Sequence, residues 1–372
     1  MGIILGARQV GKTTLVEHVL AGRDAVFLNF DVEIDKRRFL AVAELSPASG
    51  LRSLGNPKVL VVDEAQRLPE AARVVKAWHD ARLPVKILLL GSSSLNLLDQ
   101  TAESLTGRNE KLLLPPLLFE EALSAKDWYS GEAAPALLRH FAGPVRVCLL
   151  EAMAYGAYPE VATTEDRPAL LRNLSSDYLW KDILQTGLVK TPDLIRRLLM
   201  LLAHQTGAEV SVHELATQLG MARLTVERYL DLLEQTFVIF RLPSFSTNPR
   251  KEIAKGKKVF FWDTGIRNAL LNAFSTDELR PDLGALWENW AIAEVAKRNL
   301  LLGGACDLFF WRSRAQSEVD LVVKSGERLR AFQIKWRAKR RATRAFETMY
   351  GVKVELLDAS NPFIGQAALP EI

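Results

Sequence analysis

Residues Gly6 to Thr13 fit the pattern Gly-x-x-x-x-Gly-Lys-Thr, and they lie between an apolar run, Ile3 to Leu5, and a helix-like stretch, Thr14 to Leu20. A strand, a glycine-rich turn and a helix in this order form a phosphate-binding loop, in which backbone N–H groups and the positive end of the helix point at a phosphate. The pattern therefore predicts an α/β arrangement at the start of the chain and the binding of a nucleoside triphosphate.

Positions within this loop have distinct expected roles. Gly6 and Gly11 let the backbone turn tightly, and Lys12 reaches the β- and γ-phosphates. The Thr13 hydroxyl can occupy one position on Mg²⁺, which we predict as a cofactor. The residues expected to contact the nucleotide are Gly6, Ala7, Arg8, Gln9, Val10, Gly11, Lys12, Thr13 and Thr14.

A second motif, Val59 to Glu64, lies about fifty residues further along the chain. Its four apolar residues are typical of a strand buried on both faces of a parallel sheet, and the carboxyl ends of such strands are where ligands bind. We expect Asp63 to hold Mg²⁺, directly or through a water. Glu64 then lies where it can orient and deprotonate a water, which favours hydrolysis over mere binding.

A third apolar run, Lys86 to Leu90, ends in Gly91-Ser92-Ser93-Ser94. A hydroxyl at this edge can contact the γ-phosphate or the attacking water, so Ser92 or Ser93 is the candidate sensor, although serines after a strand also form ordinary turns. Arg108 is a candidate finger that neutralises charge on the phosphates, with an ordinary surface arginine as the alternative.

Composition sets the outer limits of the prediction. The chain has 372 residues, enough for two or three domains. It has no apolar run near 18 residues and no leader pattern, and its two cysteines, Cys148 and Cys306, form no metal or disulfide framework. We therefore expect a soluble, cytoplasmic protein that makes no contact with membranes.

Alternation of strand and helix signals predicts an α/β class with a doubly wound parallel sheet for the ATPase-type domain at residues 1–120. A helical lid or connector is expected at residues 121–202, a winged helix-turn-helix at 203–265, and a small α/β domain at 280–372.

The winged helix-turn-helix prediction rests on two short helical patterns. Ser211 and Glu214 form a capping box, and Gly220 ends the first pattern. The second runs from Leu224 to Gln235, and the strand-like segments that follow it could form a wing. If this module reads DNA, its groove-facing residues are Arg223, Thr225 and Arg228; it could equally be a joint between proteins or domains.

The final hundred residues contain a second candidate site. Asp320 on one predicted strand and Gln333 and Lys335 on the next would share one face of a hairpin, which is the layout of a metal-dependent phosphodiesterase. Asp320 would bind the metal and Lys335 would stabilise charge or activate water. Glu288 is the preferred further ligand over Glu294. The alternative is a half-exposed strand with alternating charges.

Taken together, these motifs resemble predicted AAA-type ATPases whose C-terminal domain of unknown function is similar to a restriction-endonuclease fold. The motifs that carry the resemblance are Gly6 to Thr13, Val62 to Gln66, Gly91 to Ser93, Gly107-Arg108, Leu114 to Leu117, Gly156 to Glu160, Thr225 to Leu230, Asp263 to Gly265, Glu318 to Asp320 and Gln333 to Trp336. The resemblance implies ATP as the nucleotide, an ATPase core, a winged-helix joint and a nuclease-like C-terminal domain.

This chain departs from that family in two respects. Gln333 stands where a Glu is usual, and a neutral amide ligates metal more weakly than a carboxylate. The chain also begins only a few residues before the phosphate loop, so we expect the helix that usually precedes it to be absent.

Three outputs of the ATPase remain open at this stage. The protein could hold DNA without cutting it, through Arg223, Thr225, Arg228 and the basic segment Arg337 to Arg344. It could be an active nuclease that uses Asp320 and Lys335. It could instead be a switch that binds a protein partner, and an oligomer is possible. The local charge supports contact with phosphates, because residues 324–347 hold nine Lys or Arg against two acids.

Overall fold

The computed structural model describes residues 1–68, 70–92, 110–129, 131, 133–178, 192–246, 256–313, 315–337 and 344–369. It contains two compact units. The first comprises Met1–Pro115 with Gln235–Phe237, and the second comprises Pro116–Glu234 with Val238–Ile372. Each unit has its own sheet and its own hydrophobic core.

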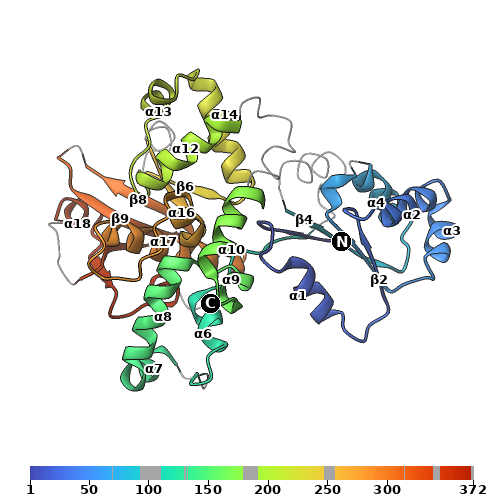
Figure 1. Ribbon diagram of the computed structural model, residues 1–372, viewed down its shortest axis with the longest axis horizontal. Helices are drawn as coiled ribbons and strands as arrows, with labels where there is room; N and C mark the ends of the chain where they lie inside the picture. The colour runs from blue at the N-terminus through green and yellow to red at the C-terminus, as the bar shows by residue number, and fades with distance from the viewer. Residues whose placement is uncertain are drawn as a thin grey trace. The chain divides into compact units, whose positions relative to one another are not determined.

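The first unit is built on a five-stranded sheet of order β2-β3-β4-β1-β5, in which every neighbouring pair is parallel (Figure 1). Its strands are β1 (Gly2–Leu5), β2 (Ala25–Asn29), β3 (Val59–Asp63), β4 (Lys86–Gly91) and β5 (Glu110–Leu113). Because β4 lies between β1 and β3, its carboxyl end lies between the loop that follows Leu5 and the carboxylate of Asp63.

Helices cover both faces of this sheet. On one face, α1 (Lys12–Val19) packs Val16 against Val59 and Val61. The helices on the other face are α2 (Glu33–Ala43), α3 (Pro47–Ser53) and α4 (Ala71–Asp80), whose buried side chains include Phe39, Leu51 and Trp78. Alternate residues of β3 enter the two cores, and the whole strand is buried. The doubly wound parallel sheet predicted from the sequence is confirmed.

The second unit begins with a helical part, as its sequence periodicity predicts. Its helices are α6 (Phe119–Ser124), α7 (Ala134–His140), α8 (Ala142–Tyr155), α9 (Pro159–Thr163), α10 (Arg167–Asn173), the π-helix η2 (Leu174–Tyr178) and α12 (Pro192–His204). No helix in the described ranges combines the length and apolarity needed to span a bilayer.

The two predicted short helices follow as α13 (Val212–Leu219) and α14 (Arg223–Gln235). The Ser211 hydroxyl caps α13 by accepting from the Glu214 N–H, and Gly220 ends it with a φ of 63°. An antiparallel hairpin of β6 (Ile239–Pro243) and β7 (Lys257–Phe261) follows these helices.

A second sheet of order β11-β10-β9-β8 forms the end of the chain. Its strands are antiparallel except for the parallel pair β10 and β11. The elements run in the order α17 (Leu283–Leu301), β8 (Asp307–Arg312), β9 (Glu318–Ser325), β10 (Arg328–Lys335), α18 (Arg344–Tyr350), β11 (Val354–Asp358) and α19 (Ile364–Ala368). Most of α17 is buried, and Trp287 and Trp290 stack within the core beside it.

A buried clasp joins the end of α8 to the start of α16 (Thr264–Leu271). The Asp263 carboxylate accepts from the Ala157 N–H at 2.7 Å and from the Ile266 N–H at 3.1 Å. Burial raises the pKa of Asp263, although these donors and the charge of Lys297 oppose the rise. The Asp263-Thr264-Gly265 motif singled out in the sequence thus has a structural role, which is to cap one helix and receive another.

Close approach explains the glycine in this motif. A Cβ at Gly265 would lie 2.1 Å from the carbonyl oxygen of Tyr155, a backbone atom that cannot move aside freely. Gly284 occupies the same second position of its helix, α17, but a Cβ there would meet no atom of another element within 4 Å.

This contrast gives a prediction for stability. We expect Gly265→Ala to lower the free energy of unfolding by about 2 kcal/mol or more, because α8 and α16 must separate. Gly284→Ala should leave it unchanged or raise it by up to about 1 kcal/mol, since alanine is the better helix former. Urea unfolding of the full chain measures both effects. Equal midpoints for the two variants would contradict the close packing of α8 against α16.

Candidate functional site

The loop between β1 and α1 has the backbone shape of a phosphate-binding turn. Gln9 and Gly11 both have left-handed φ angles, of 63° and 90°. We expected Gly6 to allow a tight turn, but the structure shows a different requirement. A Cβ at this position would lie 2.2 Å from the Leu114 carbonyl oxygen. The glycines therefore allow one turn and one close backbone approach.

Lys12 is held at the mouth of this loop. Its side chain is buried, and the ammonium donates to the carbonyl oxygens of Gly6 at 3.0 Å and Ala7 at 2.9 Å. These contacts keep a positive charge beside the loop backbone, where a phosphate would need it. Thr14, the last predicted contact, is exposed in the first turn of α1.

Thr13 and Asp63 meet although they are fifty residues apart. The Thr13 hydroxyl donates to the Asp63 carboxylate at 2.6 Å, and Asp63 is buried. A hydroxyl oxygen and a carboxylate oxygen are the ligand types that Mg²⁺ prefers, and it binds through few protein groups with water and phosphate oxygens completing its shell. The pair therefore fits the Mg²⁺ predicted here.

Glu64 lies beside this pair in a network with Gln66 and Ser92. The Gln66 amide donates to the Glu64 carboxylate and, at 3.0 Å, to the Ser92 hydroxyl. Glu64 itself has a left-handed φ of 51°, which turns the chain out of β3. Burial raises the pKa of Glu64, although the charge of Lys12 opposes the rise. The candidate base and the candidate sensor are thus linked through one amide.

No role was predicted for Gln66, although it ends the motif Val62 to Gln66, or for a neighbouring charge cluster. Asp31, just after β2, pairs with Arg8 of the loop at 3.3 Å and with Arg67 at 2.8 Å. The available signal was that Gln66 is polar and lies two residues after Glu64. Its role could not be predicted from this, because its partner Ser92 follows another strand. Ser93 and Arg108 lie outside the described residues.

The second predicted cluster lies on the C-terminal sheet. The Asp320 carboxylate accepts from the Lys335 ammonium at 2.6 Å and from the Ile334 N–H at 2.7 Å, and both Asp320 and Gln333 are buried. The structure thus brings the predicted acid and lysine into contact.

Glu288 from α17 joins the same cavity, of about 650 Å³. It is paired with Lys258 of β7 at 2.9 Å, and Lys258 also contacts Glu318 at 2.6 Å. Burial raises the pKa of Glu288 to about 7, despite the opposing charge of Lys258. Lys258 is therefore a member of this cavity that sequence reasoning missed.

Glu294, the less favoured ligand, makes its contacts outside this cavity. Its carboxylate accepts from the Phe119 N–H at 2.9 Å and pairs with Lys297 at the same distance. It lies nearly two turns from Glu288 along α17 and fastens the start of α6.

Comparison with known proteins places these sites in a family. Residues 1–123 match the family described as AAA domain, and residues 148–277 and 283–361 match two domains of unknown function, DUF8612 and DUF4143. The uncharacterized protein Rv2008c of Mycobacterium tuberculosis is 31% identical over 342 residues, which cover 90% of this chain and 69% of the relative. The chain belongs to the Rv2008c family.

Two further known proteins are similar to this chain. The uncharacterized protein MJ1544 of Methanocaldococcus jannaschii is 25% identical over 339 residues, covering 86% of this chain and 71% of the relative. A solved structure, the signal transduction ATPase with numerous domains (STAND) protein PH0952 from Pyrococcus horikoshii, matches 82% of this chain at 12% identity. Its TM-score is 0.29, and the chain spans 43% of its length. The AAA match carries the assignment of the first unit as an AAA-type P-loop domain.

The residues proposed to face DNA are on α14. Arg223 and Arg228 are exposed and Thr225 is half-buried, while Val226 and Leu230 enter the core. Arg223 pairs with Glu227 at 3.1 Å on the surface.

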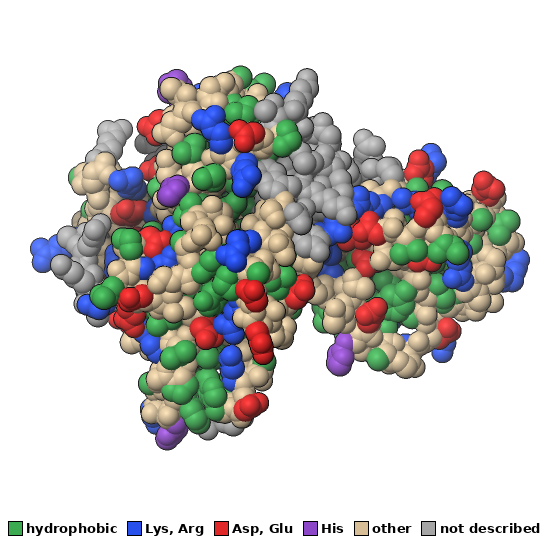
Figure 2. Space-filling model, in the orientation of Figure 1, with side chains coloured by type: hydrophobic (Ala, Val, Ile, Leu, Met, Phe, Trp, Pro, Cys, Tyr) green, Lys and Arg blue, Asp and Glu red, His purple; other side chains and the backbone are tan. Residues whose placement is uncertain are grey.

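The basic segment is only partly described. Arg337 and Arg344 are exposed, whereas Lys339, Arg340 and Arg341 lie outside the described residues. Figure 2 shows acidic and basic side chains interspersed on the visible face of each unit. The excess of positive charge in this segment is therefore a feature of the sequence that the described surface only partly displays.

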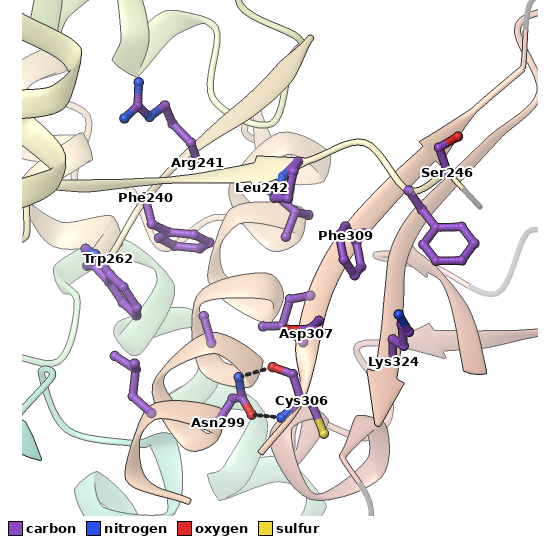
Figure 3. A pocket seen from close by; sticks show the side chains of 15 residues that line it. Phe240, Arg241, Leu242, Ser246, Trp262, Asn299, Cys306, Asp307, Phe309 and Lys324 are labelled. Carbon is purple, nitrogen blue, oxygen red and sulfur yellow. Dashed lines mark hydrogen bonds between the residues drawn. The ribbon is translucent and has the colours of Figure 1, made fainter. Parts of the chain in front are cut away.

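A separate cleft of about 810 Å³ lies between the β6–β7 hairpin, α17 and β8 (Figure 3). Phe240, Leu242 and Phe309 are among its apolar lining residues. Asn299 makes two hydrogen bonds to the main chain of Cys306, and Arg241 is paired with Glu234 and Asp231 of α14. These polar groups support the walls of the cleft, and we assign no function to it.

Proposed function

We propose that the first unit hydrolyses ATP with the help of Mg²⁺. The observation that carries this proposal is the 2.6 Å contact between Thr13 and Asp63, with Glu64 next in the chain. It supports a hydrolase because one edge of the sheet then holds a loop for phosphates, oxygen ligands for a cation and a carboxylate for water.

The loop and Lys12 would bind the phosphates. The left-handed backbone at Gln9 and Gly11 suits a turn whose N–H groups converge on an anion. Lys12 would exchange its two carbonyl partners for phosphate oxygens, which are stronger acceptors because they are charged.

Thr13 and Asp63 would hold Mg²⁺, which when bound neutralises charge on the phosphates. Glu64 would accept the proton of the attacking water. The raised pKa of its carboxyl brings it nearer to the range in which a base works best at neutral pH. Gln66 is a positioning residue, because its amide holds Glu64 and Ser92 together.

Removing the charge of Glu64 tests the hydrolytic role. We expect Glu64→Gln to lower the ATP turnover number by about 100-fold or more, with ATP affinity changed little, because general base catalysis contributes 10²–10⁴-fold. Lys12→Ala should instead weaken ATP binding as well. Glu17→Gln, an exposed change on α1, is the matched control. Normal turnover in Glu64→Gln would refute the assignment of the base.

Gln66→Leu tests the network. Without the amide, Glu64 and Ser92 lose their common donor, so we expect the turnover number to fall about tenfold while the Michaelis constant for ATP stays within about threefold. If Gln66 had a purely structural role, its loss would lower thermal stability, and the turnover number would not fall while the Michaelis constant stays the same. Steady-state kinetics together with thermal unfolding distinguish the two outcomes.

We also propose that α14 contacts the phosphate backbone of DNA and that DNA binding is linked to ATP hydrolysis. The support is that α14 turns Arg223 and Arg228 outward while its apolar side chains are buried. Two exposed guanidinium groups on one helix are suited to phosphates. A protein partner in place of DNA is the alternative outcome.

Salt dependence tests this contact. We expect duplex DNA to bind with an affinity that falls as salt rises, and Arg228→Ala to reduce the logarithmic slope by about 1, because one phosphate contact is lost. Arg196→Ala, an exposed change on α12, should leave the slope unchanged. Fluorescence anisotropy measures both, and an ATPase assay with and without DNA measures the coupling. Binding that is absent or insensitive to salt would rule out the DNA contact.

A further inference from the structure

Lys258 is a buried cation that lines the same cavity as Glu288, Asp320 and Lys335. Its side chain is 5% exposed, and its ammonium lies between Glu288 of α17 and Glu318 of β9. Burial opposes its charge, but the two carboxylates that it contacts favour the charged form. Its ammonium also lies 5.5 Å from the centre of the Phe310 ring. The lysine therefore stays charged although it is removed from solvent.

The strand that carries Lys258 is fixed to the wall of the cavity. Asn289, fully buried on α17, donates to the Phe261 carbonyl at 2.8 Å and accepts from the Phe261 N–H at 2.9 Å. Two residues away along β7, the Gly207 N–H donates to the Val259 carbonyl at 3.0 Å. These contacts fix the backbone of β7, and the Lys258 side chain extends from it to the two carboxylates.

The acids of the cavity already have positive partners. Glu288 and Glu318 share Lys258, and Asp320 pairs with Lys335. Gln333, which also lines the cavity and is buried, is neutral. Within the described parts of the chain, no three acidic, His or Cys side chains are arranged to hold a metal. The residues present therefore do not fit a divalent cation while β7 occupies this position.

We propose that Lys258 is the counter-ion of this cavity in place of a divalent cation, and that it keeps such cations out while β7 is seated. A divalent ion would have to displace an ammonium that already satisfies two carboxylates, and separating a buried ion pair leaves uncompensated charge. The β6–β7 hairpin thus holds the C-terminal cavity in a metal-free form. This inference is independent of ATP hydrolysis by the first unit.

Binding of Mn²⁺, followed by electron paramagnetic resonance without nucleotide, tests the proposal. Every chain carries Asp63→Asn, which removes the carboxylate ligand proposed for Mg²⁺ in the first unit. With Lys258 intact, we expect the amount of bound Mn²⁺ to be the same whether Asp320 is present or replaced by Asn. Lys258→Met should gain one site at least tenfold tighter than any in the parent, because it leaves the carboxylates without their ammonium. Adding Glu288→Gln should abolish the new site, because Glu288 is one of the two carboxylates that lose their ammonium.

Lys257→Met is the matched control, because Lys257 precedes Lys258 on β7 but is exposed. It should bind no more Mn²⁺ than the parent. Circular dichroism establishes that each variant is folded. If Lys258→Met fails to fold, the comparison of the parent with Asp320→Asn still decides, since Mn²⁺ lost with Asp320 would overturn the proposal. A folded Lys258→Met chain that gains no Mn²⁺ would overturn it as well.

Discussion

Parallel pairing of β1 between β4 and β5 is the constraint on which the first unit depends. Parallel strands direct their carboxyl ends to one edge, so the loop after β1, Asp63 at the end of β3 and Ser92 after β4 come together there. The contact between Thr13 and Asp63 follows from this arrangement. A site for phosphate, cation and water is thus formed by residues that are far apart in the chain.

The second unit is organised around buried polar groups that fasten one element to another. Asp263 joins α8 to α16, Asn289 joins α17 to β7, and Glu294 joins α17 to the start of α6. Each group is buried and hydrogen-bonded, so its loss would leave partners unsatisfied. Lys258 belongs to the same class, because its buried ammonium pairs with Glu288 and Glu318.

Much of this architecture could be predicted because its signals are local. The apolar run of β3, the cap at Ser211 and the alternation of strands and helices are read from neighbouring residues. Strand β5 was not predicted, because Glu110 and Lys111 give it little apolar pattern. Gln66 and Lys258 were missed for another reason, since the groups they contact come from other elements and no spacing in the chain reveals them.

The sequence by itself determined the phosphate loop and its likeness to AAA-type domains, because the residues that form the loop are consecutive in the chain. It also placed Asp320 and Lys335 on one face of a hairpin, since side chains alternate along strands. Only the tertiary structure decided that Glu288, and not Glu294, enters that cavity. It alone brought in Lys258, because burial in three dimensions selects the counter-charge that an acidic cavity receives.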